Sequence, residues 1–290
     1  MIGAQDTVVG AVWRRFRRSR LALAALVYVS VVAVIALFAP LLASAHSAIV
    51  SHSPDKVDVA HRLQPPSPEH RLGTDELGRD VLARMIHGAR VSLTVGLLAT
   101  FISLFVGCVL GALAGYYGGI IDWVVSRTIE IVLCFPFLFL VLGIVALFKA
   151  SLLTIMIALG ITSWTTEARF VRGEFLRIRE LDFAQAARAS GARDPRIIFR
   201  HLLPNALAPV LVSASFGVAS AILTESALSF LGFGIQVPTS SWGGMLAEAE
   251  DYLEYAWWLV LFPGLAIFST VAAFNIVGDR FRDALDPRSE

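Results

Sequence analysis

The sequence predicts an all-α membrane protein with six transmembrane helices. Hydrophobic residues make up 56% of the chain, whereas soluble domains average about 45–50%. Charged residues make up only 16%, and the mean hydropathy is +0.70. The apolar residues gather in six runs, and a helix of about 20 such residues crosses a bilayer. These runs are residues 21–42, 91–114, 121–148, 152–170, 206–231 and 256–277.

The first apolar run, residues 21–42, follows a basic segment, residues 1–20, that contains five arginines. Arginine-rich flanks of a span usually lie in the cytoplasm, so we expect a cytoplasmic N-terminal segment. Ala43-Ser44-Ala45 is similar to a signal-peptidase site, so a cleaved signal peptide is the alternative. The run is longer than the usual signal-peptide core of about 7–15 residues, which favours a retained first transmembrane helix.

Residues 43–90 form a polar stretch that we expect to be an external loop. Thr74 or Asp75 is suited to cap an amphipathic helix before the second span. The apolar face of this helix would hold Leu77, Val81, Leu82, Met85 and Ile86. The opposite face would hold Glu76, Arg79, Asp80 and Arg84, a pattern that suits a helix lying in the membrane interface.

The remaining spans form an expected five-helix core, residues 91–281. Gly107 and Gly111 would allow a neighbouring helix to approach the second span closely. Pro136 predicts a kink in the third span. Arg127 and Glu130 share one face of that span. Because an ionised group in a span costs about 2.5–3.5 kcal/mol, we expect them to pair, a substrate contact being the alternative.

A loop at residues 172–205 joins the fourth and fifth spans and contains two helix-start signals. Asp182 could cap a helix with Gln185 reaching back to its amide, and Gly191 could end that helix in a left-handed conformation. Asp194 and Pro195 then favour a second helix start. Pro204 marks entry to the fifth span. The pattern predicts a rigid helix-turn-helix, which an ordinary linker does not need.

Charge distribution predicts which side each loop faces. Between residues 167 and 200 there are eight arginines and five acidic residues, which places this loop with the N-terminus in the cytoplasm. Six spans would also place the C-terminal tail, residues 282–290, in the cytoplasm. The loop at 232–255 has no Lys or Arg and is expected outside.

The fifth span and the external loop after it supply further candidate residues. Glu225, with Ser226 and Ser229 nearby, is a candidate for the translocation path, where its carboxylate could meet a substrate amine or cation. A structural pairing of Glu225 is the alternative, and we favour it. In the loop after this span, Pro238-x-x-Ser241-Trp242-Gly243-x-Met245-Leu246 resembles the outer loop of bacterial ABC-importer permeases, which approaches a substrate-binding protein. The resemblance implies Trp242, Glu248, Glu250 and Asp251 as candidate contacts for that protein; a solvated acidic face is the alternative.

Two motifs resemble one known family. Ala186-Ala187, Gly191 four residues later and Leu203-Pro204 resemble the "EAA" loop of bacterial ABC-importer permeases, with Gln185 in place of the usual Glu and His201 at a late Ile position. The segment His70-x-Leu72-Gly73-Thr74-Asp75-x-Leu77-Gly78-Arg79-Asp80 resembles the "C" subunits of dipeptide, oligopeptide and nickel importers.

This resemblance implies a type I ABC-importer permease fold with a cytoplasmic coupling helix. It also implies a multi-pass protein of the bacterial inner membrane, in contact with the lipid bilayer. The implied partners are a homologous second permease, two ATP-binding subunits and an extracytoplasmic substrate-binding protein, with no nucleic acid. The implied coupling residues are Asp182, Gln185, Ala186, Ala187, Arg188, Gly191, Asp194, Pro195, His201 and Pro204.

No Gly-x-x-x-x-Gly-Lys-[Ser/Thr] loop occurs in the sequence, so ATP and Mg are expected on partner subunits and no cofactor on this chain. No Cys/His cluster has metal-site spacing, and no catalytic residues are expected. The predicted function is therefore a non-catalytic permease subunit of an ATP-driven peptide importer. An ion-coupled secondary transporter or channel, and a membrane enzyme or scaffold, are the alternatives. The alternative cargoes are glutathione, nickel complexes and haem.

Overall fold

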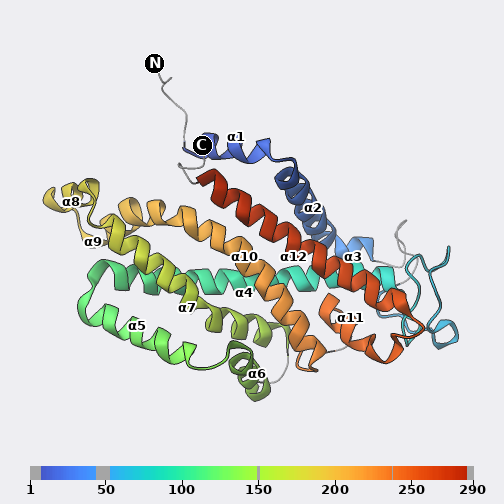
Figure 1. The fold of residues 1–290 in the computed structure, drawn as a ribbon. Coiled ribbons are helices and arrows are strands. Elements are labelled where there is room, and N and C mark those ends of the chain that lie inside the picture. Colours follow the sequence, from blue (N-terminus) through green and yellow to red (C-terminus); the bar gives the residue numbers. More distant parts are fainter. Residues whose placement is uncertain (1–7, 44–52, 149–150, 237, 286–290) are drawn as a thin grey trace.

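The computed structural model describes residues 8–43, 53–148, 151–236 and 238–285 (Figure 1). All regular elements among these residues are helices, and the β-type pairing they contain is one isolated bridge between Thr74 and Asp80. The long helices are α1 (Val8–Arg18), α2 (Arg20–Leu37), α4 (Val81–Tyr117), α5 (Gly119–Leu133), α6 (Phe137–Phe148), α7 (Leu152–Ile178), α10 (Leu203–Phe230) and α12 (Trp257–Leu285). The short ones are α3 (Ala39–Leu42), η1 (Val59–His61), α8 (Asp182–Ala189), α9 (Asp194–Arg196), the π-helix η2 (Ile197–Leu202), α11 (Trp242–Glu248) and η3 (Glu250–Tyr252).

Among the described residues, four helices are long and apolar enough to cross a membrane: α2, α4, α10 and α12. The bent pair α5 and α6 makes a fifth if it counts as one span. Helix α7 has 27 residues, about 40 Å of helix. Its second half carries hydroxyl and charged side chains, which lower its hydropathy. The predicted all-α fold is therefore confirmed for the described residues, with four or five apolar helices that could cross a membrane. The predicted number of six spans stays a prediction.

The separate amphipathic helix predicted before the second span is not present. Helix α4 begins at Val81, where the Asp80 carboxylate accepts a hydrogen bond from the Ala83 amide at 2.9 Å, and it continues unbroken to Tyr117. The predicted boundary at residue 90 lies inside this helix. Asp75 does not cap a helix either. Its carboxylate accepts hydrogen bonds from the backbone amides of Leu77 and Arg79, which stabilises the turn in the loop before α4.

The break between α5 and α6 is sharper than the kink predicted at Pro136. The two helix axes meet at 87°. Proline disfavours a helical conformation for Phe135 before it, so α5 ends and a new helix starts at Phe137. The bend turns α6 away from the direction of α5 (Figure 1).

Close packing of α4 against α7 depends on glycines at four-residue intervals. A Cβ atom on Gly107 would lie 2.5 Å from the Glu167 Cβ, and one on Gly111 would lie 2.5 Å from the Ala168 carbonyl oxygen. A Cβ on Gly115 would lie 2.6 Å from the Phe175 Cβ. The predicted close approach at Gly107 and Gly111 is confirmed, and the helix that approaches is α7.

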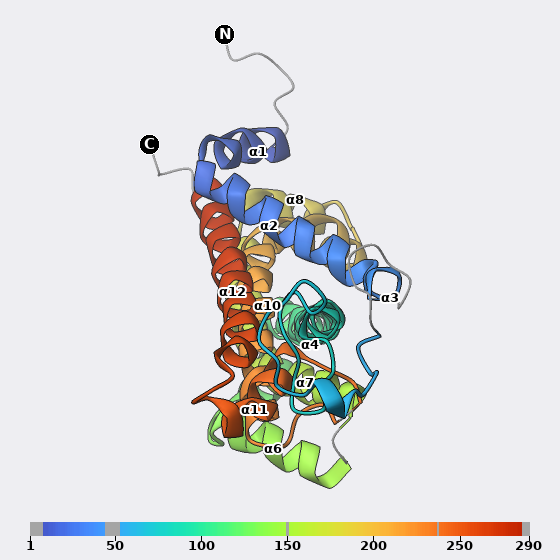
Figure 2. The same cartoon turned by 90° about the vertical axis from the view of Figure 1, so that its right-hand side faces the viewer.

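The two ends of the bundle hold different elements. Helices α8 and α9 lie at one end, whereas α11 and the loop before α4 lie at the other (Figure 1). Helix α1 crosses near the C-terminal end of α12, where the rings of Phe16 and Phe281 are 4.9 Å apart (Figure 2). Ser44 and Ala45 of the alternative cleavage site, residues 1–7 of the N-terminal segment and residues 286–290 of the tail lie outside the described residues.

Candidate functional site

A cavity of about 550 Å³ lies between α4, α7, α10 and the bend that joins α5 to α6. This volume lies within the usual range for small-ligand sites, about 300–1,000 Å³. The α10 residues that line the cavity fall between Ser213 and Thr224, inside the apolar segment Val210–Phe230 that is long enough to cross a membrane. The cavity therefore lies at the depth of the apolar helices and not at either loop end.

The cavity wall is mainly apolar, and hydroxyl-bearing residues from three helices contribute to it. They are Thr100, Ser103, Thr162, Ser163, Thr165, Thr166, Ser213, Ser220 and Thr224. The α5–α6 bend adds Phe135 and Phe137, and Phe170 and Phe216 add two further rings. Such a wall offers neutral hydrogen-bonding groups beside apolar surfaces, which suits a ligand with amide groups and varied side chains.

Glu167 is the one ionisable residue among the described residues that line the cavity. Its side chain projects from α7 and is almost entirely buried, with 8% of the residue exposed. The Ser213 hydroxyl on α10 donates a hydrogen bond to Glu167 Oε2 at 2.7 Å. The sequence analysis counted Glu167 only among the five acidic residues between positions 167 and 200, because the helix that packs against it was not known.

The three residues predicted to line the translocation path do not line this cavity. Glu225 is fully buried, and its Oε1 accepts hydrogen bonds from Ser229 at 2.8 Å and Ser241 at 2.7 Å. The Ser241 hydroxyl in turn caps α11. Ser226 packs against Gly243, where a Cβ would lie 2.4 Å from the Ser226 Cα. These three residues therefore lie outside this cavity, and the contacts of Glu225 fit the structural alternative; their place on a translocation path stays a prediction.

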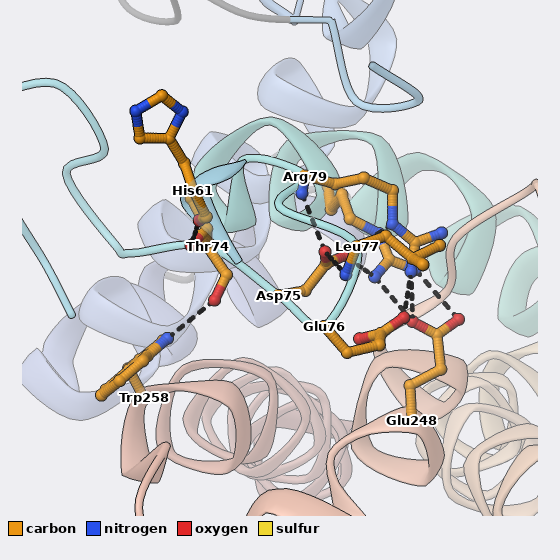
Figure 3. Close-up of polar contacts among 9 residues, drawn as sticks. His61, Thr74, Asp75, Glu76, Leu77, Arg79, Glu248 and Trp258 are labelled. Carbon is orange, nitrogen blue, oxygen red and sulfur yellow. Dashed lines mark hydrogen bonds and ion pairs between the residues drawn. The ribbon is translucent and has the colours of Figure 1, made fainter. Parts of the chain in front are cut away.

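A buried charged network joins the loop before α4, the start of α4 and α11 (Figure 3). We use this name for Asp75, Glu76, Arg79, Arg84 and Glu248. Arg84 donates hydrogen bonds of 2.6 Å to both Asp75 and Glu248. Arg79 donates to Asp75 at 2.6 Å, to Glu76 at 2.6 Å and to Glu248 at 2.9 Å. Oxygens of the three carboxylates lie within 4.8 Å of one another, and the two arginines offset their charge.

The sequence analysis predicted the wrong environment for the charged residues of this region. Arg79 and Arg84 were expected on the polar face of an interfacial helix, but their side chains are only 5% and 2% exposed. Their partner Glu248 lies 164 residues from Arg84 in the chain, so no local pattern could reveal it. Burial and the neighbouring Asp75 carboxylate raise the pKa of Glu76 above its usual value, although Arg79 opposes this.

The residues predicted to contact a binding protein divide into two groups. Trp242 is buried, and its ring N–H donates to the Met85 carbonyl oxygen at 3.0 Å. Glu248 takes part in the charged network. The burial of Trp242 leaves little of it for a partner, whereas 24% of the Glu248 side chain is exposed, and the contact with a binding protein stays a prediction. Glu250 and Asp251 are exposed in η3 at the same end of the bundle.

A helical hairpin, residues 182–202, lies at the opposite end of the bundle. Its first helix, α8, begins at Asp182 after Leu181, and no side chain caps it, so the predicted Asp182 cap is wrong. Gln185 Nε2 instead donates to the Glu180 carbonyl oxygen at 3.0 Å. Gly191 ends α8 with a φ of +75°, as predicted.

The end of α8 has the hydrogen bonds of a Schellman motif. The Ala192 amide donates to the Ala187 carbonyl at 3.1 Å, and the Gly191 amide donates to the Arg188 carbonyl at 2.9 Å. These bonds fix the turn between α8 and α9. They require the left-handed conformation at Gly191, which glycine adopts without strain.

The second half of the hairpin is not a separately capped helix. Helix α9 begins at Asp194 with Pro195 in its first turn, as expected for proline, but the Asp194 side chain does not cap it. Asp194 accepts a hydrogen bond of 2.7 Å from the Tyr116 hydroxyl at the end of α4. The chain then continues through η2, which includes His201, directly into α10. Pro204 lies in the first turn of α10.

Apolar contacts hold the hairpin against the ends of α4 and α7. Ala184, Ile197, Ile198 and Leu202 are buried with Phe175 and Ile178 in one cluster. The Arg188 guanidinium lies 5.2 Å from the centre of the Tyr116 ring. The opposite side of α8 is exposed and includes Leu181 and Phe183 at 41% each, together with Ala186. The hairpin thus has one face fixed on the bundle and one open face.

Family models and curated relatives agree with this architecture. Residues 107–290 match the model for the binding-protein-dependent transport system inner membrane component, and residues 9–66 match the N-terminal transmembrane domain of oligopeptide transport permease C. The chain is 43% identical to the dipeptide transport system permease protein DppC of Alkalihalophilus pseudofirmus, covering 95% of this chain and 88% of that protein. The chain belongs to this family of transport-system permeases. It is a multi-pass transmembrane component of an ABC importer, and the secondary-transporter, channel and membrane-enzyme alternatives are set aside.

The names of other relatives state different cargoes. The glutathione transport system permease protein GsiD of Pectobacterium atrosepticum is 38% identical over 95% of this chain and 90% of its own length. Among solved structures, the permease matches the MetNI methionine ABC transporter with a TM-score of 0.58 at 21% identity, over 71% of this chain and 97% of that one. This structural match supports the fold.

Proposed function

We propose that this permease imports peptides as half of a translocation path, with its hydroxyl-lined cavity as the segment that the cargo passes. The cavity is the observation that carries the proposal, because it places hydrogen-bonding side chains among helices that are long and apolar enough to span a bilayer. Serine and threonine hydroxyls can bond the amide groups of any peptide without regard to its side chains. The dipeptide permeases among the relatives support the same cargo class.

Six crossings are proposed: α2, α4, the α5–α6 pair, α7, α10 and α12. Counting α7 is supported by its length and by its close packing on α4 through glycine. Thr165, Thr166 and Glu167 of its polar second half line the cavity, so the hydropathy of that half is a poor guide to its position. Six crossings and the arginine-rich ends of α1 and α7 support the proposal that both termini and the 182–202 hairpin are cytoplasmic.

The 182–202 hairpin is proposed to receive force from an ATP-binding subunit through the open face of α8. Its other face is packed on Phe175 and Ile178, so a displacement of α8 would be transmitted to the ends of α4 and α7. Those two helices also form walls of the cavity. This arrangement would let a distant nucleotide-driven closure bias the opening of the path.

The remaining subunits follow from the family. The proposed assembly contains a homologous second permease, two ATP-binding subunits that bind ATP and Mg, and a substrate-binding protein outside the membrane. This chain itself would hold no cofactor and catalyse no reaction. Exposed Glu250 and Asp251 are the residues proposed to face the binding protein. Glutathione is the second candidate cargo, because a glutathione permease is among the relatives.

The test reconstitutes the full complex in liposomes and measures ATP-dependent uptake of a labelled dipeptide, glutathione, a nickel chelate and haem. Uptake of the dipeptide above the other cargoes is expected. Gly191→Val should abolish coupling, so that ATP hydrolysis continues without uptake, because valine is strained at positive φ. Gly191→Asn is the matched control, since asparagine tolerates this conformation. Equal uptake by the Val variant would refute the role of the hairpin.

A further inference from the structure

We propose that Glu167 forms a cation subsite in the cavity and binds a protonated amino group of the cargo. This inference rests on the proposed peptide import and names the part of the cargo that the site recognises. Glu167 differs from every other described residue that lines the cavity in carrying an ionisable group. At pH 7 most molecules of a peptide with an unblocked N-terminus carry an ammonium group there, because the pKa of an α-amino group is about 7.7–8.0.

The carboxylate of Glu167 has little compensation within the protein. Its one hydrogen bond among the described contacts comes from the neutral Ser213 hydroxyl, at 2.7 Å. None of the ion pairs in the described part of the chain includes Glu167. A buried carboxylate that lacks a cationic partner is costly, and the cost falls when a cation binds beside it. An ammonium group entering the cavity would supply that partner.

The packing around Glu167 directs its side chain into the cavity. The Glu167 Cβ occupies the space that a side chain at Gly107 would fill, so α4 blocks one direction. The hydrogen bond to Ser213 draws the carboxylate towards α10, on the other side. Thr166 and Phe170 on α7 line the cavity beside it. The side chain is thus held in place by contacts with its neighbouring helices before any cargo arrives.

The contrast with Glu225 separates a binding carboxylate from a structural one. Glu225 Oε1 accepts two serine hydroxyls, one of which caps α11, and the residue is fully enclosed away from the cavity. Glu167 accepts one hydroxyl and lines the cavity. The two carboxylates therefore have different surroundings, and of the two only Glu167 borders space for a ligand.

The ammonium group could come from the peptide N-terminus or from a lysine side chain. The chemistry of recognition is the same: three N–H donors meet a carboxylate and neighbouring hydroxyl oxygens. Two substrates distinguish these sources. Ala-Ala carries one ammonium group, at its N-terminus, whereas Ala-Lys carries a second on its side chain.

The experiment compares the wild-type complex with Glu167→Gln in liposomes, measuring uptake of both dipeptides per complex and ATP hydrolysis stimulated by the binding protein. Glutamine keeps the size and can still accept the Ser213 hydrogen bond, so the helix packing should persist. We expect uptake to fall about tenfold, because the variant loses one charge-assisted hydrogen bond to the cargo. ATP hydrolysis stimulated by the binding protein should remain unchanged. Glu130→Gln is the matched control: it removes a carboxylate from an exposed ion pair on α5 and should leave uptake unchanged.

The outcomes are distinct. A fall for both dipeptides assigns the subsite to the N-terminal amine, and a fall for Ala-Lys alone assigns it to the side-chain amine. Unchanged uptake of both by Glu167→Gln would overturn the proposal. If Glu167→Gln loses both uptake and stimulated ATP hydrolysis, the proposal is overturned as well, because the loss of both activities indicates a structural role. If the wild-type complex imports neither dipeptide, the proposed function itself fails.

Discussion

The charged network and the 182–202 hairpin lie at opposite ends of the bundle and are held by different forces. In the network, two arginines with 5% or less of their side chains exposed share three carboxylates from the loop before α4 and from α11. The hairpin rests on a cluster of apolar side chains and has few polar contacts with the rest of the bundle, among them the 2.7 Å bond between Tyr116 and Asp194.

This difference indicates how each end can move. Separating buried opposite charges is costly, so the network should hold the loop before α4 and α11 as one unit. Apolar contacts lack direction and allow small sliding motions with little loss of free energy. The second kind of contact suits the transmission of displacement that we propose for the hairpin. The comparison predicts a large penalty for loss of either buried arginine of the network and smaller, functional effects at the hairpin.

The largest effect is expected for Arg84→Met. The change removes the partner of Asp75 and Glu248 while keeping much of the side-chain volume, and breaking such buried pairs costs about 3–5 kcal/mol. Thermal unfolding of the detergent-solubilised protein and its yield in the membrane would measure the loss. Arg177→Met is the control, because Arg177 lies in the last turn of α7 with 62% of its side chain exposed, and exposed pairs such as Arg177–Glu174 contribute only about 0–1 kcal/mol. Equal unfolding temperatures for the two variants would show that the buried charge pairs of the network do not hold that end of the bundle more firmly.

A smaller but clear loss is expected for Gly115→Val, which acts beneath the hairpin. The new side chain would overlap the Phe175 Cβ and the Arg172 carbonyl oxygen, and overpacking costs about 1–3 kcal/mol. Because Phe175 supports the hairpin, peptide uptake by the complex should fall strongly, whereas the unfolding temperature should fall only slightly. Gly173→Val is the control, since a Cβ atom at Gly173 would have no heavy atom of another described element within 4 Å. Normal uptake by the Gly115 variant would mean that α4 and α7 can separate without consequence.

A modest local effect is expected for Tyr116→Phe. It removes the hydrogen bond to Asp194, a change of about 0.5–1.5 kcal/mol, while keeping the ring beneath Arg188. Amide hydrogen exchange should speed up in α8 and α9 but not in α11. Tyr117→Phe is the control, because Tyr117 is exposed and its hydroxyl makes none of the described hydrogen bonds. Faster exchange throughout the protein would show that the hairpin does not open independently.

The smallest effect concerns the pH dependence of Glu76. Its pKa is raised in the folded protein by burial and by Asp75, so its contribution to stability is full below the unfolded pKa, about 4.3, and is lost as pH rises through the folded value. Glu76→Gln should therefore raise the unfolding temperature slightly at pH 7 to 8, and the gain should shrink towards pH 4. A destabilised variant at pH 7 would show that the ion pair with Arg79 outweighs burial.

Local patterns predicted several features well because the causes are local. The left-handed end of α8 at Gly191, the first-turn Pro195 and the pairing of Arg127 with Glu130 each depend on residues within one or two helical turns. The predicted side-chain caps at Asp182 and Asp194 failed. Asp182 lies inside the first turn of α8, one position too late to cap it, and Asp194 found a partner in Tyr116, 78 positions earlier.

Hydropathy, charge placement and short motifs can be read along the chain, and they were enough to predict a helical membrane permease. Which polar residues border the cavity and which are structural could be seen only in the folded protein. Glu167 and Glu225 both lie on long helices, and the direction of each side chain about its helix axis separates a carboxylate beside the cavity from one that holds α11. Arg84 likewise acquired its role from Glu248, which folding alone brings beside it, since side-chain contacts depend on helix neighbours that no local pattern encodes.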